Sequence, residues 1–127
     1  MEHQLMDKLG KPLQPVVFIL MTLVAGGCLN ASFVQTGATH SPKSRYCAIE
    51  VFSSQNPDRE YDEIGIIEGT GTLWKADLED VLPKMKEEAC LVGGEALIMG
   101  SSNVYTEGKE NTRSQRVTAT VIRWKTP

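Results

Sequence analysis

The chain has few residues that could carry chemistry. Its 127 residues include two histidines and three cysteines. The histidines, His3 and His40, both precede the part of the chain with regular hydrophobic periodicity. A histidine-based metal site inside a folded domain is therefore not expected, and a catalytic cysteine would lack the histidine that activates it. The sequence predicts no catalytic residues, no bound metal and no cofactor.

Long apolar runs and clusters of like charge are also missing. The longest apolar run, residues 16–25, spans about ten residues, whereas a helix needs about twenty to cross a hydrocarbon core of about 30 Å. A permanent transmembrane helix is therefore not expected. The net charge is −3 and no basic block occurs, which argues against nucleic acid as a partner and against electrostatic binding to anionic headgroups.

The N-terminal 27 residues have a recognisable organisation. Lys8 and Lys11 precede the apolar run 16–25, and Gly26 and Gly27 follow it. Charged, apolar and small-residue regions in this order are typical of a secretory signal peptide. A core helix is the alternative, but flanking prolines and glycines and all-round apolarity favour the signal peptide.

The end of this segment, Leu23-Val24-Ala25-Gly26-Gly27-Cys28, resembles the lipobox of bacterial lipoproteins. The resemblance implies that Cys28 receives a diacylglyceryl thioether, that residues 1–27 are removed, and that the new amine is acylated. More than one acyl chain gives stable membrane anchoring. Because Leu29 follows the cysteine rather than Asp, the family's sorting rule in enteric-type bacteria implies delivery to the outer membrane, with the domain facing the periplasm or the cell surface. Ordinary secretion with a free Cys28 is the alternative.

Residues 28–44 are rich in Ser, Thr, Asn, Gly and Pro and show no sustained periodicity. This composition predicts a flexible tether, which the lipoprotein resemblance implies is lipidated at Cys28. Fully extended, it would reach roughly 50 Å at about 3.3 Å per residue. The domain could then stand clear of the membrane. The alternative is that Phe33 and Val34 pack on an edge of the domain.

Residues 45–126 predict one small domain. Alternating or apolar patterns indicate strands at about 46–52, 63–70, 95–100 and 116–124, with a helix from Leu78 between the second and third and a polar loop over 101–115. The sequence therefore predicts an α+β two-layer sandwich of about four strands in the order ββαββ. One helix cannot cover both faces of such a sheet, so one face is expected to be partly open or used for contact.

Within this domain, Gly65, Gly69 and Gly71 in the second strand indicate a bulge or close backbone approach. The helix has Asp77 as its candidate N-cap. Pro83 predicts a kink or a regular helix that starts near Leu82. The helix residues expected to form one apolar stripe are Leu78, Leu82, Met85, Ala89 and Val92.

Ile64-Gly65-Ile66-Ile67 and the helix end and strand from Glu88 to Ile98 resemble the RcsF-type sensor lipoproteins and the YbjQ-like domains. The resemblance implies the same small sandwich. For the RcsF-like branch it implies a disulfide-stabilised stress sensor that binds envelope proteins, although this chain has two domain cysteines where those sensors have four. YbjQ-like domains are described as heavy-metal binders, but this sequence supplies no ligand cluster.

The two domain cysteines, Cys47 and Cys90, could form a disulfide in an exported, oxidising compartment. Such a bond would close a loop of roughly 42 residues and stabilise the fold by about 4 kcal/mol in the chain-entropy model. Cys90 lies about 120° around the helix from the middle of the predicted stripe. Two free thiols therefore remain the alternative.

The function that these patterns predict is a non-enzymatic, lipid-anchored envelope protein that acts through protein contacts, as a sensor, adaptor or assembly factor. Trp124 and the 101–115 loop, with Tyr105, are the candidate contacts to an envelope protein partner. The alternative is a small-ligand or metal-binding module of the YbjQ-like type, either as a monomer or as an oligomer.

Overall fold

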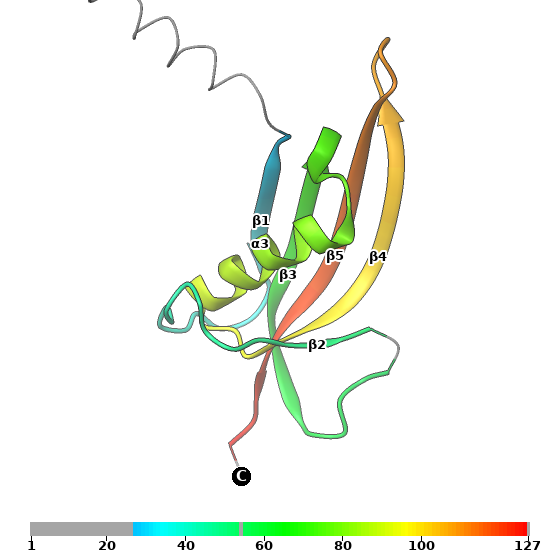
Figure 1. Cartoon of the computed structure of the whole chain (residues 1–127). Helices are drawn as coiled ribbons and strands as arrows, with labels where there is room; N and C mark the ends of the chain where they lie inside the picture. The colour runs from blue at the N-terminus through cyan, green and yellow to red at the C-terminus, as the bar shows by residue number, and fades with distance from the viewer. Residues whose placement is uncertain (1–26, 54, 127) are drawn as a thin grey trace, which may run out of the picture.

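The computed structural model describes residues 27–53 and 55–126 (Figure 1). The predicted signal peptide therefore lies almost entirely outside the described residues. The described part is a five-stranded sheet with one main helix, which confirms the predicted α+β class. In chain order the elements are β1 (Leu29–Gln35), β2 (Glu50–Phe52), β3 (Tyr61–Thr72), the 3-10 turn η1 (Leu73–Lys75), α3 (Leu78–Leu91), β4 (Ala96–Glu107) and β5 (Thr112–Trp124).

The strands lie in the order β1-β3-β5-β4-β2 across the sheet. Neighbouring strands are antiparallel except β2 and β4, which are parallel. The four predicted strands are all present and surround the helix in the predicted ββαββ order. The fifth strand, β1, comes from the segment that the sequence predicts to be a tether.

The tether prediction is wrong for residues 29–35. This segment pairs along β3, from Leu29 opposite Gly71 to Gln35 opposite Gly65. Phe33 is half-buried and packs on the core, whereas Val34 is 64% exposed on the other face. A Cβ atom at Gly65 would collide with the Phe33 ring. The composition of β1 gave no strand signal because an edge strand is held mainly by main-chain pairing with its neighbour.

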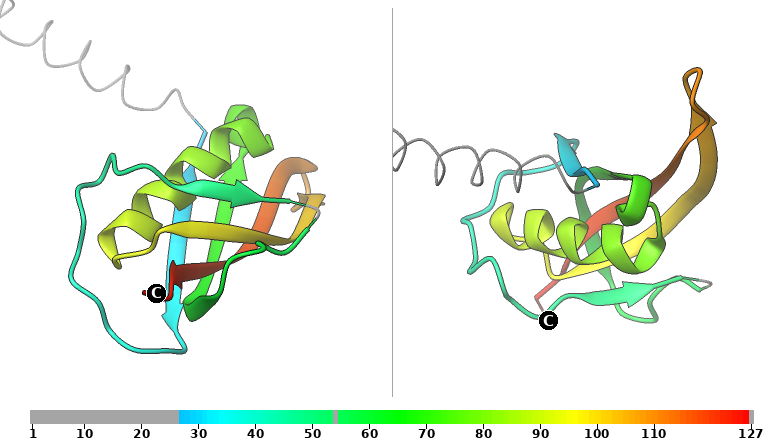
Figure 2. Two further views of the ribbon diagram at one scale, coloured as in Figure 1. Left: turned by 90° about the horizontal axis from the view of Figure 1, so that it is seen from below. Right: turned by 45° about the horizontal axis from the view of Figure 1, so that its top comes forward.

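Helix α3 lies along one face of the sheet, as Figure 2 shows. The sheet approaches closely at Gly69, where a Cβ atom would lie 2.6 Å from Val81 Cγ1. The predicted close approach of the β3 glycines is therefore confirmed, and a register shift between Glu63 and Gly65 adds the bulge. The buried core residues are Ile64, Ile67, Val81, Met85, Ala89, Leu97, Val117, Ala119 and Val121.

The helix differs from its prediction in three details. It begins at Leu78, as predicted, but it continues as a regular helix through Pro83, so the alternative of a regular part that starts only near Leu82 is wrong. Val81, Met85 and Ala89 form its buried face, whereas Leu78 is 42% exposed. Asp77 is the N-cap residue, but its side chain makes no capping hydrogen bond and instead pairs with Arg113 at 2.9 Å.

The predicted polar loop over 101–115 is also wrong. Strands β4 and β5 continue through it as a hairpin, and only residues 108–111 form the turn, with Gly108 and Asn111 at positive φ. The hairpin rises beyond the rest of the molecule (Figures 1 and 2). Its strands were not predicted because β4 is largely exposed on both faces there and the residues that β5 buries, Ser114 and Gln115, are polar, so no hydrophobic alternation marks them.

Candidate functional site

Cys28 is exposed and lies at the start of the described chain, directly before β1. Its amide N–H donates a hydrogen bond to Thr72 Oγ1 at 3.2 Å, and its carbonyl accepts one from the Thr72 amide at 2.9 Å. The residue predicted to carry the lipid is therefore attached to the end of β3. No flexible segment separates it from the sheet.

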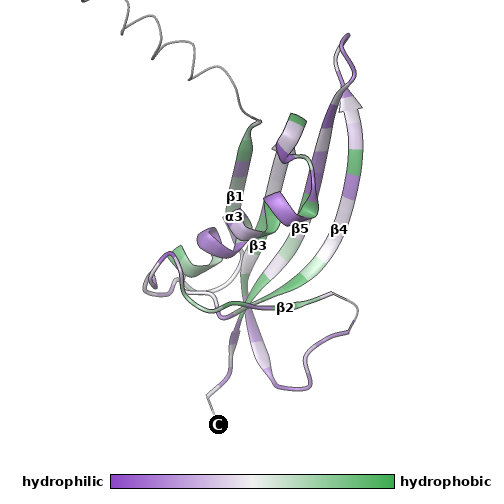
Figure 3. Ribbon diagram, in the orientation of Figure 1, coloured by the Kyte–Doolittle hydropathy of each residue, from purple (hydrophilic) through white to green (hydrophobic). Residues whose placement is uncertain are grey.

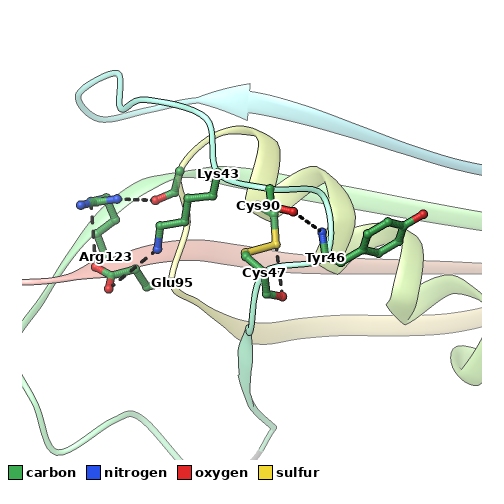
Figure 4. The surroundings of a disulfide bond; sticks show 8 residues. Lys43, Tyr46, Cys47, Cys90, Glu95 and Arg123 are labelled. Carbon is green, nitrogen blue, oxygen red and sulfur yellow. Dashed lines mark hydrogen bonds and ion pairs between the residues drawn. A yellow bond between two sulfur atoms is a disulfide. The ribbon is translucent and has the colours of Figure 1, made fainter.

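Cys47 and Cys90 form a disulfide, with a Cα–Cα distance of 5.8 Å. The predicted bond is thus confirmed, and the alternative of two free thiols is wrong. Cys90 does lie away from the face that α3 turns to the sheet. The segment 43–47 passes along that flank (Figure 4). The Lys43 amide donates to the Cys90 carbonyl at 2.9 Å. The chain itself therefore brings Cys47 to Cys90.

Glu95 joins three segments beside this disulfide (Figure 4). Its carboxylate lies 4.0 Å from Lys43 Nζ and 4.0 Å from Arg123 Nε. It also accepts a hydrogen bond from the Trp124 amide at 3.1 Å. Arg123 donates to the Gly93 carbonyl at 2.6 Å. The cluster fastens the β1–β2 connection and the end of β5 to the end of α3, and no local sequence pattern indicated it.

Trp124, one of the two predicted contact residues, is half-buried at the end of β5. Its ring meets Phe52 edge-on at a centroid distance of 6.0 Å, and the Arg59 guanidinium lies 5.0 Å from its ring centroid. Its indole therefore packs against β2 and the following loop, on the sheet face away from α3. This second small cluster covers part of the face that one helix leaves open.

Tyr105, the other predicted contact residue, lies on β4 opposite Ser114. Its side chain is on the same face of the sheet as Trp124, the face away from α3. The Arg116 guanidinium lies 5.1 Å from its ring centroid, and Arg116 Nε lies 3.5 Å from Glu68 Oε1. Register places several exposed or half-exposed residues on this face beside them. We call this set the open face; it comprises Val34, Ile66, Glu68, Thr118, Thr120, Tyr105 and Arg116.

A cavity of about 330 Å³ lies at the end of β1 remote from Cys28. Its apolar wall includes Phe33, Ile64, Leu91 and Val92, and residues of the β1–β2 connection, including His40, complete it. This cavity was not anticipated from the sequence, because the segment that encloses it was interpreted as a tether.

The described residues contain neither a cluster of potential metal ligands nor a helix suited to span a membrane. No group of three or more His, Cys, Asp or Glu side chains in residues 27–53 and 55–126 is placed to hold a metal ion. Over the same ranges, no helix has the length and apolar character needed to cross a membrane.

No protein family model matches the sequence, and no curated protein matches it. Among solved structures, the chain is similar to the crystal structure of the Francisella virulence factor FvfA in its orthorhombic form. The two chains are 15% identical, with a TM-score of 0.48. The match covers 72% of this chain and 97% of the other.

Proposed function

We propose that this chain is a non-enzymatic, lipid-anchored protein of a bacterial cell envelope that acts through contacts with other envelope proteins. The observation that carries the proposal is the Cys47–Cys90 disulfide. Disulfides of this kind persist in exported proteins and are rare in the reducing cytosol. The bond therefore agrees with the export that residues 1–27 predict.

The exposed position of Cys28 supports the anchor. Its thiol is free, and the chain on its N-terminal side is the segment that cleavage would remove. N-acylation converts the new amine to an amide that keeps one N–H. The hydrogen bond from the Cys28 nitrogen to Thr72 Oγ1 is therefore compatible with the acylated residue. Leu29 in the next position supports delivery to the outer membrane, with the domain facing the periplasm or the cell surface.

The open face supports the contact function. It is one side of a sheet whose other side is covered by α3, and it combines exposed apolar residues with a charged pair. Val34 and Ile66 are 64% and 48% exposed there. Tyr105 and Arg116 contribute an aromatic ring and a guanidinium, the groups most enriched at the energetic centres of interfaces. We assign the partner contact to this face, with Trp124 at its end.

The experiment is an intact mass of the full-length protein, expressed in a bacterial host, extracted from membranes and alkylated without reduction. We expect the mass of residues 28–127 plus acyl groups, without alkyl adducts. A Cys28→Ser variant is the matched control and should keep the signal peptide and carry no acyl group. A chain without acyl groups in the natural protein would overturn the anchor.

The partner contact has its own test. A photo-crosslinking residue at position 66 or 105 should capture a defined envelope protein, and the same residue at exposed Glu79 on α3 should not. Capture from neither open-face position would contradict the assignment.

The cavity beside Phe33 favours a second candidate function, a module that binds a small apolar ligand and is related in fold to the YbjQ-like domains. Its lining is largely apolar, as in most small-molecule sites. Native mass spectrometry of the extracted protein, with light scattering for oligomers, would detect a stoichiometric ligand or a ring. Either result would favour this function over the first. Equilibrium dialysis against a panel of metals tests the metal-binding form of the same alternative.

A further inference from the structure

Exposed apolar side chains gather near Cys28. Leu29, Leu73 and Trp74 are 36%, 47% and 74% exposed. Leu29 pairs with Gly71, and Thr72, which bonds to Cys28, directly precedes η1. Figures 1 and 2 show the start of β1 and η1 side by side, at the end of the molecule opposite the C-terminus, and Figure 3 shows hydrophobic residues in both.

The turn that presents Leu73 and Trp74 is fixed by the core. Ala76, directly after η1, is fully buried, and its amide donates to the Leu73 carbonyl at 3.3 Å. Gly71 admits the Lys75 backbone, because a Cβ atom there would collide with the Lys75 carbonyl. Leu73 has φ of +57°, a conformation that a leucine rarely adopts. The two apolar side chains are therefore held outward by a defined backbone.

We infer that Leu29, Leu73 and Trp74, which we call the membrane patch, lie in the interfacial layer of the lipid bilayer beside the acyl chains of Cys28. The inference rests on the proposed lipid anchor. Tryptophan is the residue most suited to this layer, because its ring is apolar and its N–H can still bond to water or headgroups. Lys75, the next residue, has a long apolar stem and a charge that can reach the headgroups.

The position of the anchor decides in favour of lipid over a protein as the occupant. Cys28 is bonded to Thr72 and is followed at once by β1. Acyl chains on Cys28 therefore bring the bilayer to the same end of the domain as η1. The β4–β5 hairpin also rises at this end, and its turn, Gly108 to Asn111, is polar apart from glycine. Such a turn can lie among headgroups and water.

The two tryptophans provide an internal control. Trp74 belongs to the membrane patch, and Trp124 lies at the other end of the sheet, near the C-terminus. In the full-length chain, Trp124→Phe leaves Trp74 as the only indole, and Trp74→Phe leaves Trp124. Each acylated protein, verified by mass, is placed in phosphatidylcholine vesicles brominated near the headgroup end of the acyl chains. Bromine quenches only the indoles that reach it.

We expect the emission of Trp74 to fall by about twofold or more relative to unbrominated vesicles, as for an indole in the interface, and that of Trp124 to change little. If Trp124→Phe fails to fold, the difference between the natural chain and Trp74→Phe gives the Trp74 emission.

An acylated protein in which Trp74 is quenched no more than Trp124 would overturn the membrane patch and leave the anchor intact. A chain without acyl groups would overturn both. Capture of a protein by a photo-crosslinker at position 74 in cells would overturn lipid as the occupant.

Discussion

Cys28 and Thr72 are joined by two hydrogen bonds, one to the Thr72 hydroxyl and one between backbone groups, although their sequence separation is 44. The residue proposed to carry the lipid is therefore part of the sheet's edge. A domain on a long tether could reach partners up to tens of ångströms from the membrane. If Cys28 carries the proposed lipid, this domain would instead lie directly on the bilayer, and a partner would meet it there, on the open face or along the hairpin.

A flexible insertion should separate the anchor from the membrane patch. Eight Gly and Ser residues placed between Cys28 and Leu29 would let the domain move by roughly 16 Å, at about 5–6 Å times the square root of the linker length. We expect unchanged acylation and a loss of at most about 1–2 kcal/mol in the free energy of unfolding, from the two hydrogen bonds between Cys28 and Thr72. Most of the quenching of Trp74 by brominated lipid should be lost. The same insertion after Gly108, in the hairpin turn, is the control and should leave the quenching unchanged.

Leu73→Gly should separate stability from membrane contact. A leucine at positive φ costs roughly 1–2 kcal/mol relative to glycine in that conformation, so the free energy of unfolding should rise by about 1 kcal/mol after allowance for the more flexible unfolded chain. Quenching by brominated lipid should fall, because a membrane-patch side chain is lost. Leu73→Ala is the control, which removes the side chain and keeps the strained φ. Urea unfolding measures the first effect, and a loss of stability in Leu73→Gly would contradict it.

Removing the disulfide should destabilise the domain strongly. The bond spans a sequence separation of 43 residues, which corresponds to about 4 kcal/mol in the chain-entropy model. The Cys47→Ala/Cys90→Ala double variant should lose about that much in urea unfolding. Dithiothreitol should produce a similar loss in the natural protein and no further loss in the variant. An equal effect of the reductant on both would show that the loss has another origin.

Gly69→Ala should overpack the core. The new Cβ would lie 2.6 Å from Val81 Cγ1 and 2.7 Å from Met85 Cγ, and overpacking of this kind costs about 1–3 kcal/mol. Because the clash involves Val81, the Gly69→Ala/Val81→Ala pair should be less destabilising than the sum of the two single variants. Strict additivity in thermal or urea unfolding would place the helix farther from β3 than the structure does.

Reversing the charge of the open face should weaken partner capture without unfolding the domain. Arg116 is exposed, and its pairing with Glu68 is worth little in water. Arg116→Glu should therefore change the free energy of unfolding by about 0.5 kcal/mol or less and reduce crosslinking from position 105. Arg113→Glu, which breaks the exposed ion pair with Asp77, is the matched control and should leave the capture unchanged. Equal capture by both variants would assign the contact elsewhere.

Part of the architecture could be read from residue patterns alone. Val117, Ala119 and Val121 alternate with polar neighbours in β5, and this period-two pattern requires a strand with one buried face. The order of the four predicted strands and of the helix followed from such patterns. The two domain cysteines in a chain with a predicted export signal indicated a disulfide, but their pairing was left open because Cys90 does not share the face that α3 turns to the sheet.

The tertiary structure decided the features that depend on distant residues. Whether 29–35 forms a strand depends on the free edge of β3, and the length of the β4–β5 hairpin depends on cross-strand bonding rather than on burial. The segment 43–47 places Cys47 against Cys90, and the bonds of Thr72 place Cys28 beside η1. Local periodicity reports only which face of an element is buried. The pairing of β1 with β3, the contact of Cys47 with Cys90 and the position of Cys28 beside η1 all depend on segments tens of residues away. Only the folded chain therefore specifies them.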